Sequence, residues 1–155
     1  MNGSERKTTI LLIEDDLSLL DNTCEILRLN GYEVLTASSA KKGVETLVGS
    51  KPDLILCDIQ MPGPKGHVVL HYAKLSPENS NIPFLFFSAQ TEPKAIFDAM
   101  EAGADDYLQK PFLVEELLDI VEKHVKKSPN SFKKQKRSQK EFELVNFDRN
   151  PEIFA

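Results

Sequence analysis

The sequence predicts an α/β fold in which a five-stranded parallel sheet is covered by helices on both faces. Short, almost wholly apolar runs recur along the chain, which is typical of strands buried on both sides. Segments with apolar residues at helical spacing separate these runs. Strands and helices that alternate in this way form doubly wound sheets, whose ligands bind beyond the carboxyl ends of the strands.

The alternation contains five strands and five helices. The expected strands are the apolar runs at residues 10–13, 34–37, 54–57, 84–87 and 107–108. The expected helices follow them, with apolar positions at Leu17, Leu20, Cys24 and Leu27; at Ala40, Val44, Leu47 and Val48; within residues 68–75; at Ile96, Ala99 and Met100; and at Val114, Leu117, Val121 and Val125. Each helix therefore has an apolar stripe with which to cover the sheet.

Local signals mark where several helices begin and end. Gly31 is expected to end the first helix, because glycine readily adopts the left-handed conformation found after helix C-termini. Ser38 or Ser39 can accept a backbone N–H at the start of the second helix. Pro93 suits the first turn of the fourth helix, which Gly103 closes.

The composition is that of a soluble globular protein. The chain has 155 residues, 41% of them hydrophobic and 28% charged, and a net charge of −5. Its longest apolar runs fall far short of the about 20 residues that cross a bilayer, and its start has no apolar stretch of signal-peptide length. Cys24 and Cys57 lack the spacing of a metal site. We therefore expect a cytoplasmic protein with reduced thiols and no membrane partner.

Charge divides the chain near residue 127. Seven Lys and Arg residues and no acid lie between Lys126 and Lys140, whereas residues 141–155 carry four acids against Arg149, which leaves a net charge of −9 on residues 1–125. The turn-forming stretch "SPNS", residues 128–131, lies at this boundary. We expect a domain at 1–127 and a basic linker or tail at 128–155, which could lead to an output module absent from this sequence.

Polar residues follow four of the five expected strands and form the candidate site. These residues are Glu14, Asp15, Asp16, Asp58, Ser88 and Lys110. The carboxyl ends of parallel strands share one edge, so the acids would repel one another unless a cation lay among them. Mg²⁺ suits such carboxylate oxygens. With a lysine and a hydroxyl close by, the set is suited to placing a phosphoryl group on Asp58.

Each of these residues alone has a simpler explanation. Asp15 or Asp16 is more often a helix N-cap than a metal ligand, and one of them is expected to cap the first helix. Ser88 alone is a common strand-end residue, and a single Lys110 is more often a solvated surface charge. Their placement at four separate strand ends favours the common site.

Four stretches carry a family resemblance: "ILLIEDD", "LILCDIQMPG", "FLFFSA" and "GADDYLQKPF". In this order and spacing they closely resemble the receiver domain of bacterial response regulators, over roughly residues 8–127. The resemblance implies a flavodoxin-like sheet with strand order 2-1-3-4-5. It also implies a phosphorylation switch of a two-component system, in which Asp58 accepts a phosphoryl group from a sensor histidine kinase or a phosphotransfer protein in the presence of Mg²⁺.

The resemblance assigns a metal role to several residues. It implies that Glu14, Asp15, Asp58 and the backbone carbonyl of Gln60 hold Mg²⁺, which leaves Asp16 as the helix cap. The chain departs from the usual pattern in two places. Glu14 stands where Asp is common, and Pro64–Lys65 follows the loop where acidic or apolar residues are more usual.

The resemblance also implies a switch. Ser88 matches the switch hydroxyl, Tyr107 the switch aromatic ring and Lys110 the lysine that pairs with the phosphoryl group, with a cis bond before Pro111. Phosphorylation is then expected to alter the face formed by the fourth helix, the fifth strand and the fifth helix. A partner, or a second copy in a homodimer, is expected to bind there.

Two other functions fit parts of the pattern. A Mg²⁺-dependent phosphohydrolase with an aspartate nucleophile has a similar site, but it typically carries a second Asp two positions after the nucleophile, where this chain has Gln60. A regulator with a nucleic-acid-binding tail would use the basic stretch "KKQKR". Residues 128–155 are too few for a helix-turn-helix module, so nucleic acid is not an expected partner. We therefore expect a signalling phosphoacceptor rather than an enzyme.

Four residues with reactive side chains are given structural roles. His67 and His71 are four residues apart, but without a third ligand nearby they are expected on an exposed helix face. Cys57 should point to the opposite side of the strand from Asp58, into the core. His124 is expected to be an ordinary residue of the last helix.

Overall fold

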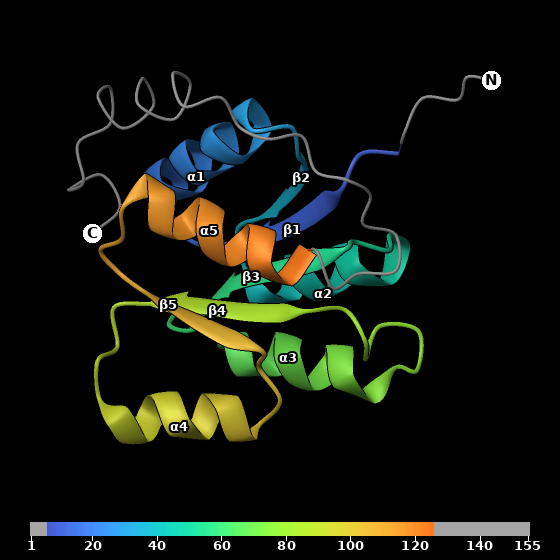
Figure 1. The fold of residues 1–155 in the computed structure, drawn as a ribbon. Coiled ribbons are helices and arrows are strands. Elements are labelled where there is room, and N and C mark those ends of the chain that lie inside the picture. The colour runs from blue at the N-terminus through green and yellow to red at the C-terminus, as the bar shows by residue number, and fades with distance from the viewer. Residues whose placement is uncertain (1–5, 126–155) are drawn as a thin grey trace.

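Five strands and five helices alternate along the chain (Figure 1). The computed structural model describes residues 6–125, so the expected linker at 128–155 lies outside the described residues. The elements are β1 (Thr9–Ile13), α1 (Leu17–Leu29), β2 (Glu33–Ala37), α2 (Ala40–Gly49), β3 (Leu54–Asp58), α3 (Gly66–Leu75), β4 (Phe84–Ser88), α4 (Pro93–Glu101), β5 (Asp106–Gln109) and α5 (Val114–Val125).

The five strands form one parallel sheet in the order β2-β1-β3-β4-β5. This confirms the predicted fold class and strand order. Helices α1 and α5 cover one face of the sheet, and α2, α3 and α4 lie on the other (Figure 1). None of the helices within residues 6–125 is long and apolar enough to cross a membrane.

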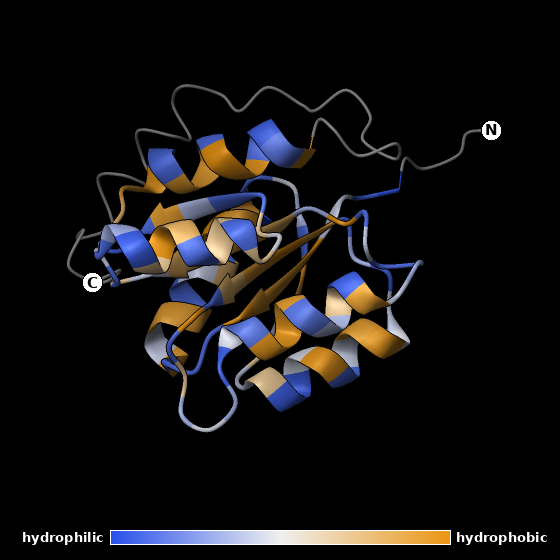
Figure 2. Cartoon of the chain, turned by 90° about the horizontal axis from the view of Figure 1, so that it is seen from below, coloured by the Kyte–Doolittle hydropathy of each residue, from blue (hydrophilic) through white to orange (hydrophobic). Residues whose placement is uncertain are grey.

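The sheet separates two apolar cores, because successive side chains of a strand point to opposite faces. On β1, Ile10 and Leu12 pack under α1 and α5, whereas Leu11 and Ile13 pack under α2 and α3. Cys57 belongs to the second core and is fully buried, as predicted. Figure 2 shows the apolar strands between helices whose inner faces are apolar and outer faces polar.

The helix ends follow the predicted signals. The carboxylate of Asp16 accepts the N–H of Leu19 at 3.1 Å and caps α1. Of the two candidate serines, Ser39 is the cap of α2, because its hydroxyl accepts the N–H of Lys42 at 3.1 Å. Gly31 after α1 and Gly103 after α4 have φ values of 92° and 120°, which only glycine adopts readily.

Some of the apolar helix positions do not face the core as predicted. Leu17 of α1 and Val48 of α2 are largely exposed, and Met100 of α4 is exposed as well. In α4, Ala99 is the buried residue. Met100 is exposed because α4 packs against β5 at the edge of the sheet, where one short strand offers little apolar surface.

Two aspartates fix the edge of the sheet where the strands begin. The carboxylate of Asp53 accepts the N–H of Thr9 at 2.8 Å and pairs with Arg6 at 3.0 Å. In the same way, the carboxylate of Asp105 accepts the N–H of Phe84 at 2.8 Å. Both bonds satisfy a backbone donor at the start of a strand, where the ladder has no partner for it.

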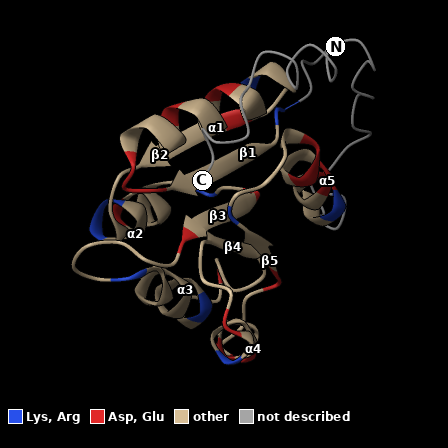
Figure 3. Ribbon diagram, turned by 90° about the vertical axis from the view of Figure 1, so that its left-hand side faces the viewer, with Lys and Arg blue, Asp and Glu red and all other residues tan. Residues whose placement is uncertain are grey.

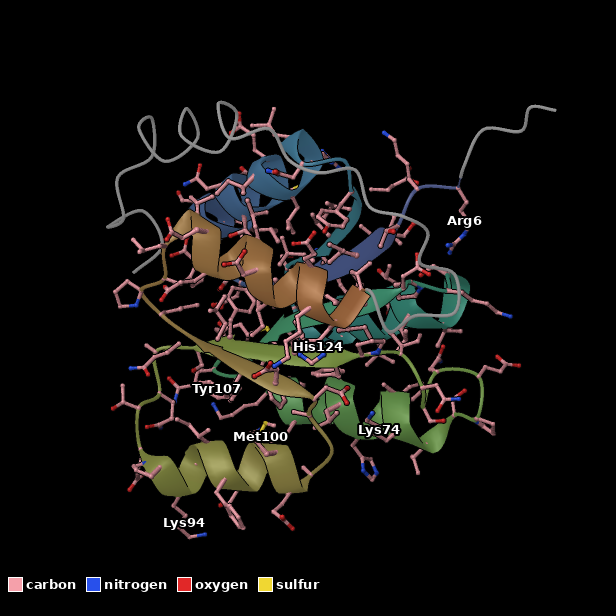
Figure 4. The ribbon with its side chains drawn as sticks, in the orientation of Figure 1. Arg6, Lys74, Lys94, Met100, Tyr107 and His124 are labelled. Atoms are coloured by element: carbon pink, nitrogen blue, oxygen red, sulfur yellow. The ribbon has the colours of Figure 1, made fainter. Side chains whose placement is uncertain are left out.

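His124 has a structural role that its place in the sequence did not reveal. Its side chain is buried and reaches from α5 to β5 (Figure 4), where Nε2 lies 2.8 Å from a carboxylate oxygen of Asp106. The ammonium of Lys123 lies 3.4 Å from the same oxygen. Burial by itself raises the pKa of Asp106, but the hydrogen bonds from His124 and from the N–H of Tyr107 outweigh it and hold the pKa below 3.8.

The Asp106 contact should make stability depend on pH in the acid range. Because the folded pKa lies below the unfolded value, the charged carboxylate stabilises the fold above about pH 4, and this contribution is lost as the pH falls through the folded pKa. Asp106→Asn should lower the free energy of unfolding at pH 7 by about 1 kcal/mol, and the difference from wild type should narrow toward pH 3. Urea unfolding at both pH values measures this.

Asp98→Asn is the matched control for this experiment. Asp98 pairs with Lys94 at 3.0 Å, but both side chains are exposed, so the change should cost less than about 0.5 kcal/mol. A difference between Asp106→Asn and wild type that stays constant from pH 7 to pH 3 would contradict the assignment.

Candidate phosphorylation site

The candidate site lies at the carboxyl ends of the strands, on the edge seen in Figure 3. Glu14 and Asp15 follow β1, Asp58 is the last residue of β3, Ser88 is the last residue of β4, and Lys110 follows β5. The structure therefore brings together, at one edge, residues that are up to 96 positions apart in the chain. The parallel register causes this, because it ends neighbouring strands at nearly the same level.

Three carboxylates form the centre of the site. One oxygen each of Glu14, Asp15 and Asp58 lies within 4.8 Å of the others. Glu14 and Asp58 are buried, whereas Asp15 is half-buried. Three hard oxygen donors at this separation have the chemistry that Mg²⁺ requires.

Lys110 supplies the positive charge of the site. Its ammonium lies 2.7 Å from Oε1 of Glu14 and 3.6 Å from Oδ1 of Asp58, and 4.9 Å from the centre of the Phe87 ring. The peptide bond from Lys110 to Pro111 is cis, as the resemblance implied. The Lys110 N–H also donates to the carbonyl of Ser88 at 2.8 Å, so β4 and the residue after β5 are joined at the site.

The pKa values of the Glu14 and Asp58 carboxyl groups are both raised. Burial raises the pKa of Glu14 to about 7; the charge of Asp58 adds to this, while the Lys110 and Asp16 hydrogen bonds oppose it. Burial likewise raises the pKa of Asp58, against the charge of Lys110. Burial thus disfavours the charged forms of both carboxyl groups, and a cation bound among them would favour those charged forms.

The neighbouring acid residues have separate positions. The Asp16 side chain caps α1 and its N–H donates to Oε2 of Glu14 at 3.0 Å, so Asp16 is engaged on the helix side. Asp15 is the member of the pair that joins the carboxylate cluster. The N–H of Gln60 lies 3.3 Å from Oδ1 of Asp58, which brings the Gln60 backbone to the site. The metal role of its carbonyl stays a prediction.

Ser88 and Tyr107 are connected through one loop. The hydroxyl of Ser88 is fully buried and accepts the N–H of Gln90 at 3.1 Å. The hydroxyl of Tyr107 donates to the carbonyl of the same Gln90 at 2.9 Å. Burial raises the pKa of Tyr107, and a hydrogen bond with Ser88 opposes this. The ring is half-buried and packs against the core under α3.

Two residues of the site were not predicted from the sequence. Gln90 gave no signal, because it acts through its backbone. Gly66 begins α3, two residues before the predicted start, and a Cβ atom there would overlap the carbonyl oxygen of Asp58. Its N–H donates to the carbonyl of Ile59 at 2.9 Å. His67 and His71 lie on the exposed part of this helix, as predicted.

Comparison with known proteins identifies the class. The sequence matches the response regulator receiver domain family over residues 10–122, and the chain belongs to this family. It is therefore a receiver domain of the two-component response regulators.

Named relatives include regulators of transcription. The chain is 38% identical over 103 residues to the sensory transduction protein BceR of Halalkalibacterium halodurans, covering 66% of this chain and 43% of that protein. It is 34% identical over 110 residues to the phosphate regulon transcriptional regulatory protein PhoB of Pseudomonas aeruginosa, covering 71% and 48%. The chain thus spans less than half the length of these relatives.

Solved structures share the fold. A putative response regulator from Chloroflexus aurantiacus has a TM-score of 0.75 at 31% identity, covering 79% of this chain and 100% of that one. The chemotaxis protein CheY4 of Vibrio cholerae has a TM-score of 0.73 at 24% identity, covering 76% and 98%, and it supports the fold alone.

The close approach of α3 to Asp58 predicts a strict requirement for glycine. Gly66→Ala would place a methyl group against backbone that cannot move aside easily, and it should lower the free energy of unfolding by about 1–3 kcal/mol. Urea unfolding monitored by circular dichroism measures this. Gly49→Ala is the control, because a Cβ there meets nothing within 4 Å, and it should be neutral or slightly stabilising. Equal midpoints for the two variants would refute the packing argument.

Proposed function

We propose that this receiver domain is phosphorylated on Asp58 by a sensor histidine kinase or a phosphotransfer protein. The observation that carries the proposal is the position of the Asp58 carboxylate, which lies among two further acids and 3.6 Å from the Lys110 ammonium. The family generally binds Mg²⁺ at its acidic pocket. In this chain we assign Mg²⁺ to Glu14, Asp15, Asp58 and the backbone carbonyl of Gln60.

The reaction uses Asp58 as the nucleophile. A carboxylate oxygen attacks the phosphorus of a phosphohistidine, the P–N bond breaks, and the imidazole leaves with the electron pair and takes up a proton. The product is an acyl phosphate, which water later hydrolyses. The metal supplies positive charge for the phosphoryl oxygens when it is bound. Lys110 supplies a second positive charge from the protein itself.

A phosphohydrolase acting on external substrates is not supported. Such an enzyme needs an acid to protonate the leaving group, and the residue two positions after Asp58 is Gln60, whose side chain carries no such proton. We therefore assign the chain to signalling. In this role it hydrolyses the phosphoryl group on its own Asp58 and not those of external substrates. The proposed compartment is the cytoplasm, where histidine kinases present their phosphohistidine.

We propose that Ser88 transmits the presence of the phosphoryl group to the rest of the domain. We propose that its hydroxyl donates to a phosphoryl oxygen, while Lys110 pairs with another. The loop at Gln90 joins Ser88 to Tyr107, so a shift of Ser88 changes the position of the Tyr107 ring. The Tyr107 ring is half-buried in the described structure. Phosphorylation would shift the equilibrium between this position of the ring and a more buried one.

The surface that changes is the face made by α4, β5 and α5. Phe97 and Met100 of α4 and Leu113 before α5 are exposed apolar residues on or beside it. We propose that a partner or a second copy of the chain binds there when Asp58 is phosphorylated. Residues 128–155, outside the described residues, are proposed as a basic linker or tail, which could lead to an output module.

The first experiment tests the acceptor. Incubation of the full chain with acetyl phosphate and Mg²⁺ should add one phosphoryl group by intact mass, and a chelator or Asp58→Asn should abolish it. Asp98→Asn, an exposed acid on α4, is the control and should react as wild type does. Phosphorylation of Asp58→Asn at the wild-type yield would remove Asp58 from this role.

The second experiment tests the switch. Beryllofluoride, which mimics the phosphoryl group, should shift the amide signals of residues 93–125 in wild type. Ser88→Ala should reduce these shifts, and Lys110→Ala should reduce them further, because each removes a contact to the phosphoryl oxygens. Lys94→Ala, an exposed residue of α4, should leave them unchanged. Full wild-type shifts in the Ser88→Ala, Lys110→Ala double variant would defeat the mechanism.

A further inference from the structure

Helix α3 exposes an apolar stripe that the switch does not use. Val68, Tyr72 and Leu75 follow one another at four- and three-residue spacing, and they are 47%, 44% and 68% exposed. This spacing places them on one face of the helix, opposite the buried Val69, Leu70 and Ala73. Three large apolar side chains in a row on a helix surface are typical of a docking site.

The charge around the stripe is positive. Residues 40–51 and 65–75, which contain α2 and α3, carry five lysines against one carboxylate, Glu45. Figure 3 shows lysines on α2 and α3, and carboxylates on α1 and α4. The helix that carries the stripe and the neighbouring α2 are therefore basic in an otherwise acidic domain, although Lys74 also lies 4.0 Å from Asp105, and the stripe fits an occupant that is both apolar and acidic.

The chain contains such an occupant. Segment 141–155, "EFELVNFDRNPEIFA", carries four acids against one arginine, and it includes Phe142, Leu144 and Phe147. We propose that segment 141–155 of this chain docks on the α3 stripe of the same molecule. Its apolar side chains would cover Val68, Tyr72 and Leu75, and its acids would face the lysines of α2 and α3.

The chain length permits this contact. Helices α3 and α5 each lead back from the site, so both end at the edge where the strands begin (Figure 1). The 15 residues 126–140 can span up to about 50 Å when extended. A domain of this size has a radius of gyration of about 14 Å, so a path from the end of α5 around the sheet to α3 is within reach.

Charge also argues against the other exposed apolar residues as the docking site. Phe97 and Met100 lie on α4, whose exposed Asp98 and Glu101 would repel an acidic segment. Leu29 of α1 and Val48 of α2 are exposed singly rather than as a stripe. Docking on α3 leaves the face of α4, β5 and α5 open for the partner proposed above.

The test places a nitroxide spin label on the segment of the full chain. Asn146→Cys provides the attachment site, because the native Cys24 and Cys57 are buried. We expect the amide signals of residues 66–75 to lose intensity and those of α1 and α5 to keep it. Leu75→Glu and Tyr72→Glu should restore the α3 signals, because each removes an apolar contact and adds a charge that repels the acidic segment, whereas Leu29→Glu, a change at an exposed leucine of α1, should not. All three positions are exposed, so the fold should tolerate these changes.

Three results would overturn the proposal. One is loss of signal on α4, β5 and α5 instead of α3, and another is full α3 intensity in the labelled chain. The third is an effect that appears only when spin-labelled and isotope-labelled molecules are mixed, which would indicate contact between copies. The readout does not involve Asp58, so it is independent of whether the proposed phosphorylation occurs.

Discussion

The contact of the Lys110 ammonium with Glu14 and Asp58 is the interaction on which the site depends. Three acids packed within 4.8 Å would otherwise repel one another in a partly buried pocket. Lys110 offsets part of that repulsion, and it can do so because the strands are parallel and β5 ends beside β4. The sheet topology is therefore a condition for the electrostatics, and the electrostatics are a condition for phosphoryl transfer.

Much of the fold was predictable because a parallel sheet leaves a strong pattern in sequence. Strands buried on both faces must be apolar throughout, and the polar residue that ends such a run is then conspicuous. The positions of Asp58, Ser88 and Lys110 at the strand ends followed from this alone. The assignment of Asp16 rather than Asp15 to the helix cap needed the family pattern, because the two residues are chemically identical.

Other features were not predictable, because they depend on distances in three dimensions. Nothing in the last helix distinguishes His124, whose role arises from the strand that α5 crosses. Helix periodicity predicted buried positions for Leu17 and Val48, but a helix that covers a narrow sheet buries only part of its apolar residues. The early start of α3 at Gly66 reflects contact with a backbone carbonyl, and no side-chain pattern reports such a contact.

The bonds of Asp53 and Asp105 have a consequence for the direction in which the domain can deform. They secure the starts of β1 and β4 through backbone N–H groups, far from the acidic pocket. The ends of the strands beside Asp58 carry the charge that phosphorylation would change, and these two bonds do not reach them. A phosphoryl group on Asp58 would act on the loops after the strands, whereas the chain that enters the sheet at Thr9 is hydrogen-bonded at the opposite edge. A domain fused before Thr9 would thus remain mechanically separate from the signal.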